Sequence, residues 1–198
     1  MASDRNKRER KRNRPQRRSR RGSVTRGPSS NASGPSAHSA TGITVRRVPG
    51  ADAWELVHPA KVLRRQEDME EVRTMLDAGE IDMAVDELRW LLSGCRELLE
   101  AHRLLGEIAL ANNDLPLAQA HFGYAFDMGQ EAIRQASDFS GPLPYALVAN
   151  QAFLEAGKGL AHCLGRLGDQ KAAQRIVQRL LELDPSDPLK VRESTELA

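Results

Sequence analysis

The sequence predicts an all-α protein, a short solenoid of about three helix hairpins preceded by a long, disordered basic arm. An amphipathic segment recurs after 34 residues, with "AGEIDMAVDELRWLL" at 78–92 followed by "NNDLPLAQAHFGYAF" at 112–126. A third copy, "LGDQKAAQRIVQRLLELDP", starts at Leu167 and is delayed by 21 residues. Such a period is typical of helix–turn–helix solenoids. Residues 1–47, in contrast, offer almost nothing that a core could bury.

The arm at 1–47 carries the positive charge of the chain. It has 14 Lys and Arg against 2 acids, whereas residues 48–198 have 15 against 25. Ordering it would cost roughly 1–2 kcal/mol per residue without a hydrophobic return, so we expect disorder. Arginine side chains bind phosphates in a bidentate manner. The residues predicted to bind polyanions are Arg10, Lys11, Arg12, Arg14, Arg17, Arg18, Arg20 and Arg21.

Three interpretations of the arm stay open: binding of RNA or another polyanion, a nuclear-import signal in a eukaryotic source, or a solubilising tail. Nucleic-acid contact through the arm would be electrostatic and nearly independent of sequence, because no aromatic residue lies near it to stack on bases. The stretch "RRGSV" around Ser23 resembles a basophilic kinase site. A phosphate on Ser23 would subtract about two charges from the arm.

The folded part is expected to begin with an extended segment at 48–58, held in place by Trp54. His58–Pro59 then predicts a helix start, because proline favours the first helical turn. Apolar residues spaced by three or four predict one continuous helix up to Gly79.

Helices then follow in pairs, and the paired pattern extends to Pro185. The predicted helices are 81–94, 97–111, 115–135, 145–168 and a last one that closes at Leu183. The stretch "SDFSGPLP" at 137–144 interrupts the array, and we place an insertion near 130–150. Residues 186–198 form a short tail or helix. An acid precedes each second helix, where a carboxylate caps free N–H groups; these acids are Glu80, Asp114 and Asp169.

Over roughly 66–185, the recurring residues resemble the tetratricopeptide repeat family. The small residues Ala84, Ala118 and Ala173 would lie where two helices cross closely, and larger residues follow each of them four positions later. The resemblance implies a right-handed solenoid over 59–185. It also implies a non-enzymatic adaptor or scaffold that binds a protein or peptide partner in a groove lined by the first helices. The groove residues that it implies are Arg73, Arg103, Glu107, Lys158 and His162.

Some members of this family clamp a C-terminal carboxylate with Lys and Asn. This chain has no Asn at the matching positions, so an acidic peptide held by Arg73, Arg103 and Lys158 is the alternative, and a plain solvated face is another. The uncovered face of a terminal repeat would favour self-association. The competing function is that of an RNA- or ribosome-associated protein, in which the arm supplies the affinity and the repeats only assemble.

No catalytic, cofactor or metal site is predicted. The histidines are scattered without a nucleophile or carboxylate partner, and "GKGLAHCLG" at 157–165 lacks the phosphate-loop pattern. Cys95 and Cys163 are interpreted as buried, reduced thiols. No apolar run approaches the roughly 20 residues of a membrane span, so we expect a cytoplasmic protein, or a nuclear one in a eukaryote.

Overall fold

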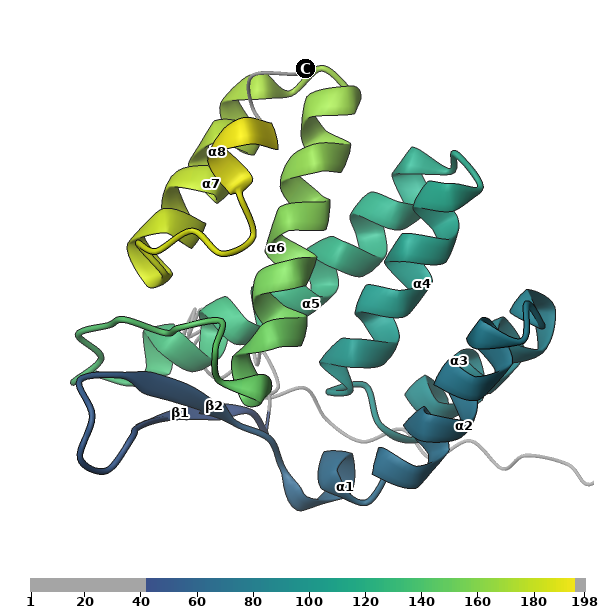
Figure 1. The fold of residues 1–198 in the computed structure, drawn as a ribbon, viewed down its shortest axis with the longest axis horizontal. Helices are drawn as coiled ribbons and strands as arrows, with labels where there is room; N and C mark the ends of the chain where they lie inside the picture. Colours follow the sequence, from purple (N-terminus) through teal and green to yellow (C-terminus); the bar gives the residue numbers. More distant parts are fainter. Residues whose placement is uncertain (1–41, 195–198) are drawn as a thin grey trace, which may run out of the picture. The chain divides into compact units, whose positions relative to one another are not determined.

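A computed structural model describes residues 42–194, which all belong to one compact unit, His38–Ala198. Antiparallel helices pack in succession along the chain (Figure 1). None of the helices in this described part is long and apolar enough to cross a membrane. The elements are β1 Thr44–Arg47, β2 Trp54–Val57, α1 Ala60–Leu63, α2 Gln66–Asp77, α3 Ile81–Gly94, α4 Leu99–Ala111, α5 Leu115–Gln135, α6 Val148–Arg166, α7 Gln170–Leu183 and α8 Val191–Ser194.

The three helix pairs, α2–α3, α4–α5 and α6–α7, share one kind of turn. The second residue after each first helix adopts a positive φ: 78° at Gly79, 57° at Asn113 and 90° at Gly168. This left-handed conformation ends a helix and suits glycine or asparagine. Asp114 and Asp169 cap the following helices as predicted, each accepting a backbone N–H, at 3.1 and 3.0 Å.

Residues at the recurring positions of the second helices are buried. Ala84, Ala118 and Ala173 are at most 2% exposed. The residues four positions later, Leu88, Phe122 and Val177, are at most 7% exposed. The amphipathic pattern therefore faces the core in all three pairs, and the expected close crossings fall at small side chains.

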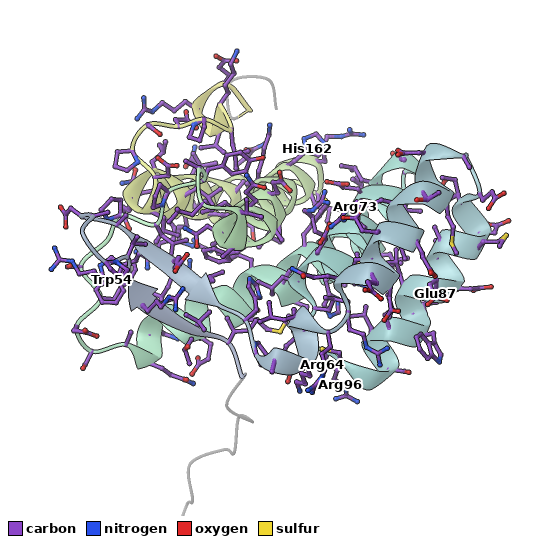
Figure 2. The ribbon with its side chains drawn as sticks, turned by 60° about the horizontal axis from the view of Figure 1, so that its bottom comes forward. Trp54, Arg64, Arg73, Glu87, Arg96 and His162 are labelled. Atoms are coloured by element: carbon purple, nitrogen blue, oxygen red, sulfur yellow. The ribbon has the colours of Figure 1, made fainter. Side chains whose placement is uncertain are left out.

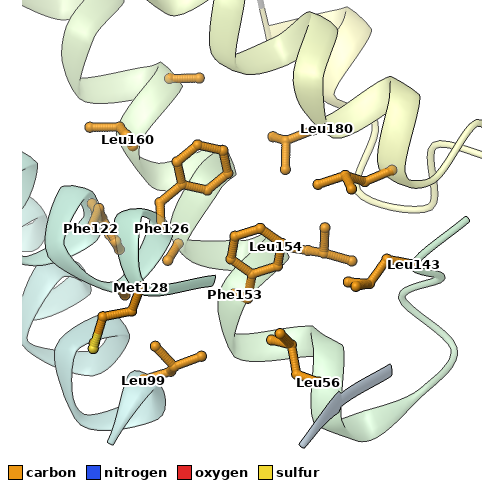
Figure 3. Packing of buried hydrophobic residues seen from close by; sticks show 14 of the residues in the cluster. Leu56, Leu99, Phe122, Phe126, Met128, Leu143, Phe153, Leu154, Leu160 and Leu180 are labelled. Carbon is orange, nitrogen blue, oxygen red and sulfur yellow. The ribbon is translucent and has the colours of Figure 1, made fainter. Parts of the chain in front are cut away.

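The core has two parts that meet at α4. The smaller cluster joins α2, α3 and one side of α4, and the larger one joins the other side of α4 to α5, α6, α7 and the two strands. In the larger cluster, Phe126 and Phe153 stack with their centroids 5.2 Å apart (Figure 3). Phe153 lies against Gly129, where an added Cβ would come within 2.2 Å of the ring. Close approach of α5 and α6 thus requires glycine.

The predicted C-terminal boundary of the arm, at Arg47, was wrong. Ile43 is completely buried, and β1 pairs antiparallel with β2, with Thr44 opposite Val57. The segment expected to be extended at 48–58 is therefore the turn and second strand of a hairpin. A four-residue strand is too short for hydrophobic periodicity to reveal. In addition, β1 carries two arginines, so it reads as part of the basic arm. The predicted disorder of residues 1–41 lies outside the described residues.

Asn150, on α6, anchors this hairpin. Its side-chain oxygen accepts the N–H of Leu56 at 2.9 Å, and its amide donates to the carbonyls of Trp54 and Pro144 at 3.1 and 2.9 Å. The side chain of Asn150 is fully buried, and its oxygen and its NH₂ group are both hydrogen-bonded. Trp54 also packs against Phe139 from the loop after α5, with centroids 5.2 Å apart. The interruption predicted at 137–144 is thus a loop that the hairpin covers.

The helix predicted continuously from Pro59 to Gly79 is divided into α1 and α2 by a turn at Arg64 and Arg65. Contacts with α3 and the loop that follows it hold both sides of this turn: Lys61 binds Glu97 at 2.7 Å, and Arg65 lies over the ring of Trp90. Tertiary contacts therefore override the local periodicity here. The final short helix expected after Pro188 is α8.

Candidate functional site

The first helices of the three pairs surround a cleft of about 570 Å³. Apolar side chains border it, and two of them are strongly exposed: Leu63 at 52% and Val148 at 79%. Exposed apolar residues beside a concave surface are typical of interaction sites. The residues that line this cleft are His58, Val62, Leu63, Arg65, Gln66, Met69, Glu70, Arg73, Leu98, Leu99, Glu100, Val148, Ala149 and Ala152.

Charged side chains link the three first helices across this face. Arg73 of α2 contacts Glu100 of α4 at 2.7 Å, and Arg103 of α4 contacts Glu155 of α6 at 3.1 Å. We call this series of contacts the ion-pair chain. Tyr145, in the loop before α6, extends it by donating its hydroxyl to Glu155 at 2.6 Å. Figure 2 shows Arg73 among these helices.

The carboxylates of the ion-pair chain determine the electrostatics of the face. Hydrogen bonds from Arg73 to Glu100 and Glu70 raise the pKa of the Arg73 guanidinium. The hydrogen bond to Glu155, together with burial, raises the pKa of Tyr145. Both groups therefore keep their protons at neutral pH, and Tyr145 acts as a hydrogen-bond donor.

The predicted groove residues divide into two groups. Arg73 and Arg103 lie on the expected face, but their guanidinium groups already bind carboxylates of this chain, and Glu107 is one of them, at 2.6 Å from Arg103. Lys158 and His162 lie further along α6 than Ala152, outside the residues that line the cleft. Burial, with the nearby Arg166 and Lys158, lowers the pKa of His162. The cations expected to hold an acidic peptide are thus largely compensated.

Sequence reasoning missed His58, Leu63 and Val148 as residues of the cleft. The ring of His58 contacts the carbonyl of Ala149 through Nε2 at 3.0 Å. With that nitrogen donating, Nδ1 is an acceptor, and it has no partner among the described residues. An apolar residue at the first position of a helix, such as Val148, interrupts no pattern. No sequence signal therefore distinguishes it.

His102 and His121 form a second group of titratable side chains, between α4 and α5. Their Nδ1 atoms lie 3.3 Å apart, and Nε2 of His102 contacts the carbonyl of Arg96 at 3.2 Å. Burial and the neighbouring His121 lower the pKa of His102 to about 4. Within residues 42–194, no group of three or more His, Cys, Asp or Glu side chains is arranged to hold a metal ion.

The predicted arm residues and Ser23 lie outside the described residues. Cys95 and Cys163 are buried free thiols, and burial raises the pKa of each.

Comparison of the chain with protein-family models, curated proteins and solved structures found no match.

Proposed function

We propose that this protein is a non-enzymatic adaptor, built on a tetratricopeptide-like solenoid, that binds a protein or peptide partner in the cleft between α2, α4 and α6. The observation that carries the proposal is the cleft itself, with Leu63 and Val148 exposed at its border. The recurring turns and buried alanines support the solenoid, because each pair presents its first helix to the same side.

The cleft suits an extended peptide with an apolar anchor. Burial of one Val- or Leu-sized side chain contributes about 1.5–3 kcal/mol, which an anchor between Leu63 and Val148 would gain. A polar group beside it then fixes the direction of the peptide backbone: the exposed side-chain amide of Gln66 donates or accepts a hydrogen bond.

A strongly acidic peptide fits less well. Arg73 and Arg103 are each in contact with two or more carboxylates of the chain, so an incoming carboxylate would have to displace Glu100 or Glu155. Replacing one ion pair by another yields little net free energy at a partly exposed site. We therefore propose that the ion-pair chain fixes the angle between the first helices, and that the partner is recognised mainly through apolar contact.

The test is capture of partners from the source cell by the full chain and by Val148→Asp. This substitution places a charge in the cleft, and its position in the first turn of α6 favours an acid, so α6 stays folded. The matched control is Leu117→Asp, which places the same charge in the first turn of α5, at a residue 43% exposed and outside the cleft. All captures are treated with nuclease, so that proteins bridged by RNA are removed.

We expect proteins that the wild type and Leu117→Asp retain but Val148→Asp loses by tenfold or more. A synthetic peptide from the captured protein should then bind the purified chain with the same ranking of variants. Equal capture by all three proteins would refute the cleft as the binding site.

A further inference from the structure

Trp90, near the end of α3, is an exposed aromatic residue outside the cleft. Its side chain is 56% exposed although the guanidinium of Arg65 lies over one face of the ring, 5.1 Å from the centroid. An exposed indole that a cation supports from one side has its other face available for a planar ligand. The repeat does not require this residue for its core, since Leu88 and Leu91 fill the buried positions of α3.

Two segments meet beside Trp90, the turn between α1 and α2 and the loop between α3 and α4. Nη2 of Arg65 lies 3.5 Å from the position that a Cβ on Gly94 would take. Lys61 binds Glu97 in the same loop at 2.7 Å. Arg64 and Arg96 belong to these two segments, and Figure 2 shows both in one region of the molecule. Arg65 thus lies between Trp90 and the start of the second segment at Gly94.

Ion pairs compensate Lys61 and Arg65 in these segments, whereas Glu97 acts on Arg96 only through its charge. Asp68 is bound by Arg65 at 3.0 Å, and Glu97 by Lys61. Across residues 42–194, neither Arg64 nor Arg96 has a carboxylate within ion-pair distance, and both side chains are exposed. Residues 48–198 as a whole carry an excess of acids. A basic, aromatic surface on an acidic domain is therefore a local feature and not a consequence of composition.

A second exposed ring is connected to the same loop through His102. Tyr124 lies 34 residues after Trp90, so the two occupy equivalent positions in α3 and α5. Tyr124 is 45% exposed, and its ring packs on that of His102 with centroids 4.6 Å apart. His102 in turn contacts the backbone carbonyl of Arg96. Both exposed aromatic rings thus have a planar side chain packed against them.

We propose that this surface, formed by Arg64, Arg65, Trp90 and Arg96 with Tyr124 at its margin, binds single-stranded nucleic acid. Bases stack on the exposed rings, and the guanidinium groups of Arg64 and Arg96 bind the phosphates between them. An acidic protein would pair with the arginines but has no use for the aromatic rings, and a duplex hides its base faces. The surface lies outside the arm and shares Arg65 with the border of the cleft, and it places base stacking on the folded domain.

The full chain provides a direct readout of stacking. It contains two tryptophans. Trp54 is only 3% exposed, so a ligand in solution quenches the emission of Trp90 and not that of Trp54. We expect an oligouridylate of about 20 nucleotides to quench the tryptophan emission in a saturable manner at about 0.15 M salt. Heparin, which is a polyanion without bases, should bind the arm without quenching. An oligothymidylate of the same length separates RNA from DNA, and poly-glutamate represents an acidic protein.

Affinity measured by fluorescence anisotropy of labelled oligouridylate completes the test. Trp90→Ala should weaken binding by about fivefold or more, since one stacked base is lost. Arg64→Ala with Arg96→Ala should lower the slope of log K against log salt by about 1.4 in magnitude, as expected for two lost contacts to a single strand. The matched control is Lys171→Ala with Arg175→Ala, which removes two exposed cations from α7 and should leave Trp90 quenching unchanged.

Each other outcome overturns the proposal. If heparin quenches as strongly as the oligonucleotide, Trp90 reports charge and not stacking. If poly-glutamate binds and depends on Trp90 while oligonucleotides do not, the surface binds an acidic protein. If both double variants lose affinity equally, or Trp90→Ala retains the wild-type affinity, nucleic acid binds elsewhere. Circular dichroism confirms that each variant is folded.

Discussion

The first helix pair and the two that follow are built on the same turns but on different cores. Around α2 and α3, the described core consists of Leu, Val, Ala, Met and Cys side chains without an aromatic ring. Around α5 and α6 it contains Phe122, Phe126 and Phe153, and glycines on the facing helices receive their rings (Figure 3). The two strands add Trp54 and Leu56 to this larger core.

This difference teaches how one repeated pattern gives regions of unequal rigidity. Aliphatic side chains, Met above all, adjust to their surroundings, whereas a ring seated against a glycine has one way to pack. We therefore expect the first pair to open locally at a lower free energy than the rest of the domain, with α4 as the boundary between the two.

The largest effect should come from removing a ring. Phe153→Ala is expected to lower the free energy of unfolding by about 3–5 kcal/mol, because a rigid core collapses poorly around the cavity. Leu88→Ala, in the aliphatic core, should cost about 2–3 kcal/mol, because Met69 and its neighbours relax into the space. Chemical denaturation measures both. Hydrogen exchange should accelerate throughout the domain for Phe153→Ala and mainly in α2 and α3 for Leu88→Ala. Equal patterns of exchange would show that the two cores unfold as one.

Two glycines of α5 sharpen the comparison within one helix. A Cβ at Gly129 would lie 2.2 Å from Phe153, whereas at Gly123 the nearest atom, of Leu160, is 3.8 Å away. We expect Gly129→Ala to destabilise by about 1–3 kcal/mol through overpacking. Gly123→Ala should stabilise by about 0.5–1 kcal/mol through helix propensity. Thermal unfolding with opposite shifts for the two variants is the expected result, and stabilisation by both would contradict the ring-and-glycine packing.

The low pKa of His102, on α4, predicts that the protein loses stability in acid. Its pKa in the folded protein is about 4, against an ordinary value of 6.5, because of burial and His121. The unfolded chain therefore binds a proton first as the pH falls, and stability decreases between about pH 6.5 and 4. With the partial exposure of the ring taken into account, the loss should be of the order of 1 kcal/mol. Denaturation of wild type and His102→Gln at pH 7 and pH 4.5 checks this, since the variant should lose less.

The smallest effect concerns the helix caps. Asp114→Ala and Asp169→Ala should each cost roughly 0.5–1 kcal/mol, because each carboxylate accepts a backbone N–H. Glu80, at the same position of the first pair, makes no such bond, so Glu80→Ala should change stability by no more than a few tenths. If Glu80→Ala lowered stability as much as Asp114→Ala and Asp169→Ala do, the negative charge, and not the hydrogen bond to the backbone, would account for the capping effect.

The sequence was sufficient to predict helix bounds where an amphipathic segment recurs. The helices α3 and α5 have the predicted bounds, because an acid or asparagine turn starts each one and the apolar spacing defines its face. It was insufficient where distant segments meet. The hairpin depends on Asn150, about 100 positions later in the chain, and the turn at Arg64 and Arg65 depends on Trp90 and Glu97.

For the candidate site, the sequence predicted which helices carry Arg73 and Arg103, but not which side chains these arginines bind. Arg73 and Arg103 are on the first helices as expected, yet their partners Glu100 and Glu155 belong to the next pair. Contacts between successive helix pairs depend on how the pairs pack in three dimensions, which spacing along one chain does not encode. The same reason applies to Val148 and Leu63, which come together only in three dimensions.

The burial of Ile43 decides where the chain is cut in any deletion experiment. A truncation that removes residues 1–47 would discard β1 with the arm, and the lost pairing would leave β2 with an unprotected edge. A loss of binding by that shortened protein would then report damage to the domain and would be misattributed to the missing cations. Removal of residues 1–41 keeps Ile43 in place and isolates the role of the arginine-rich arm.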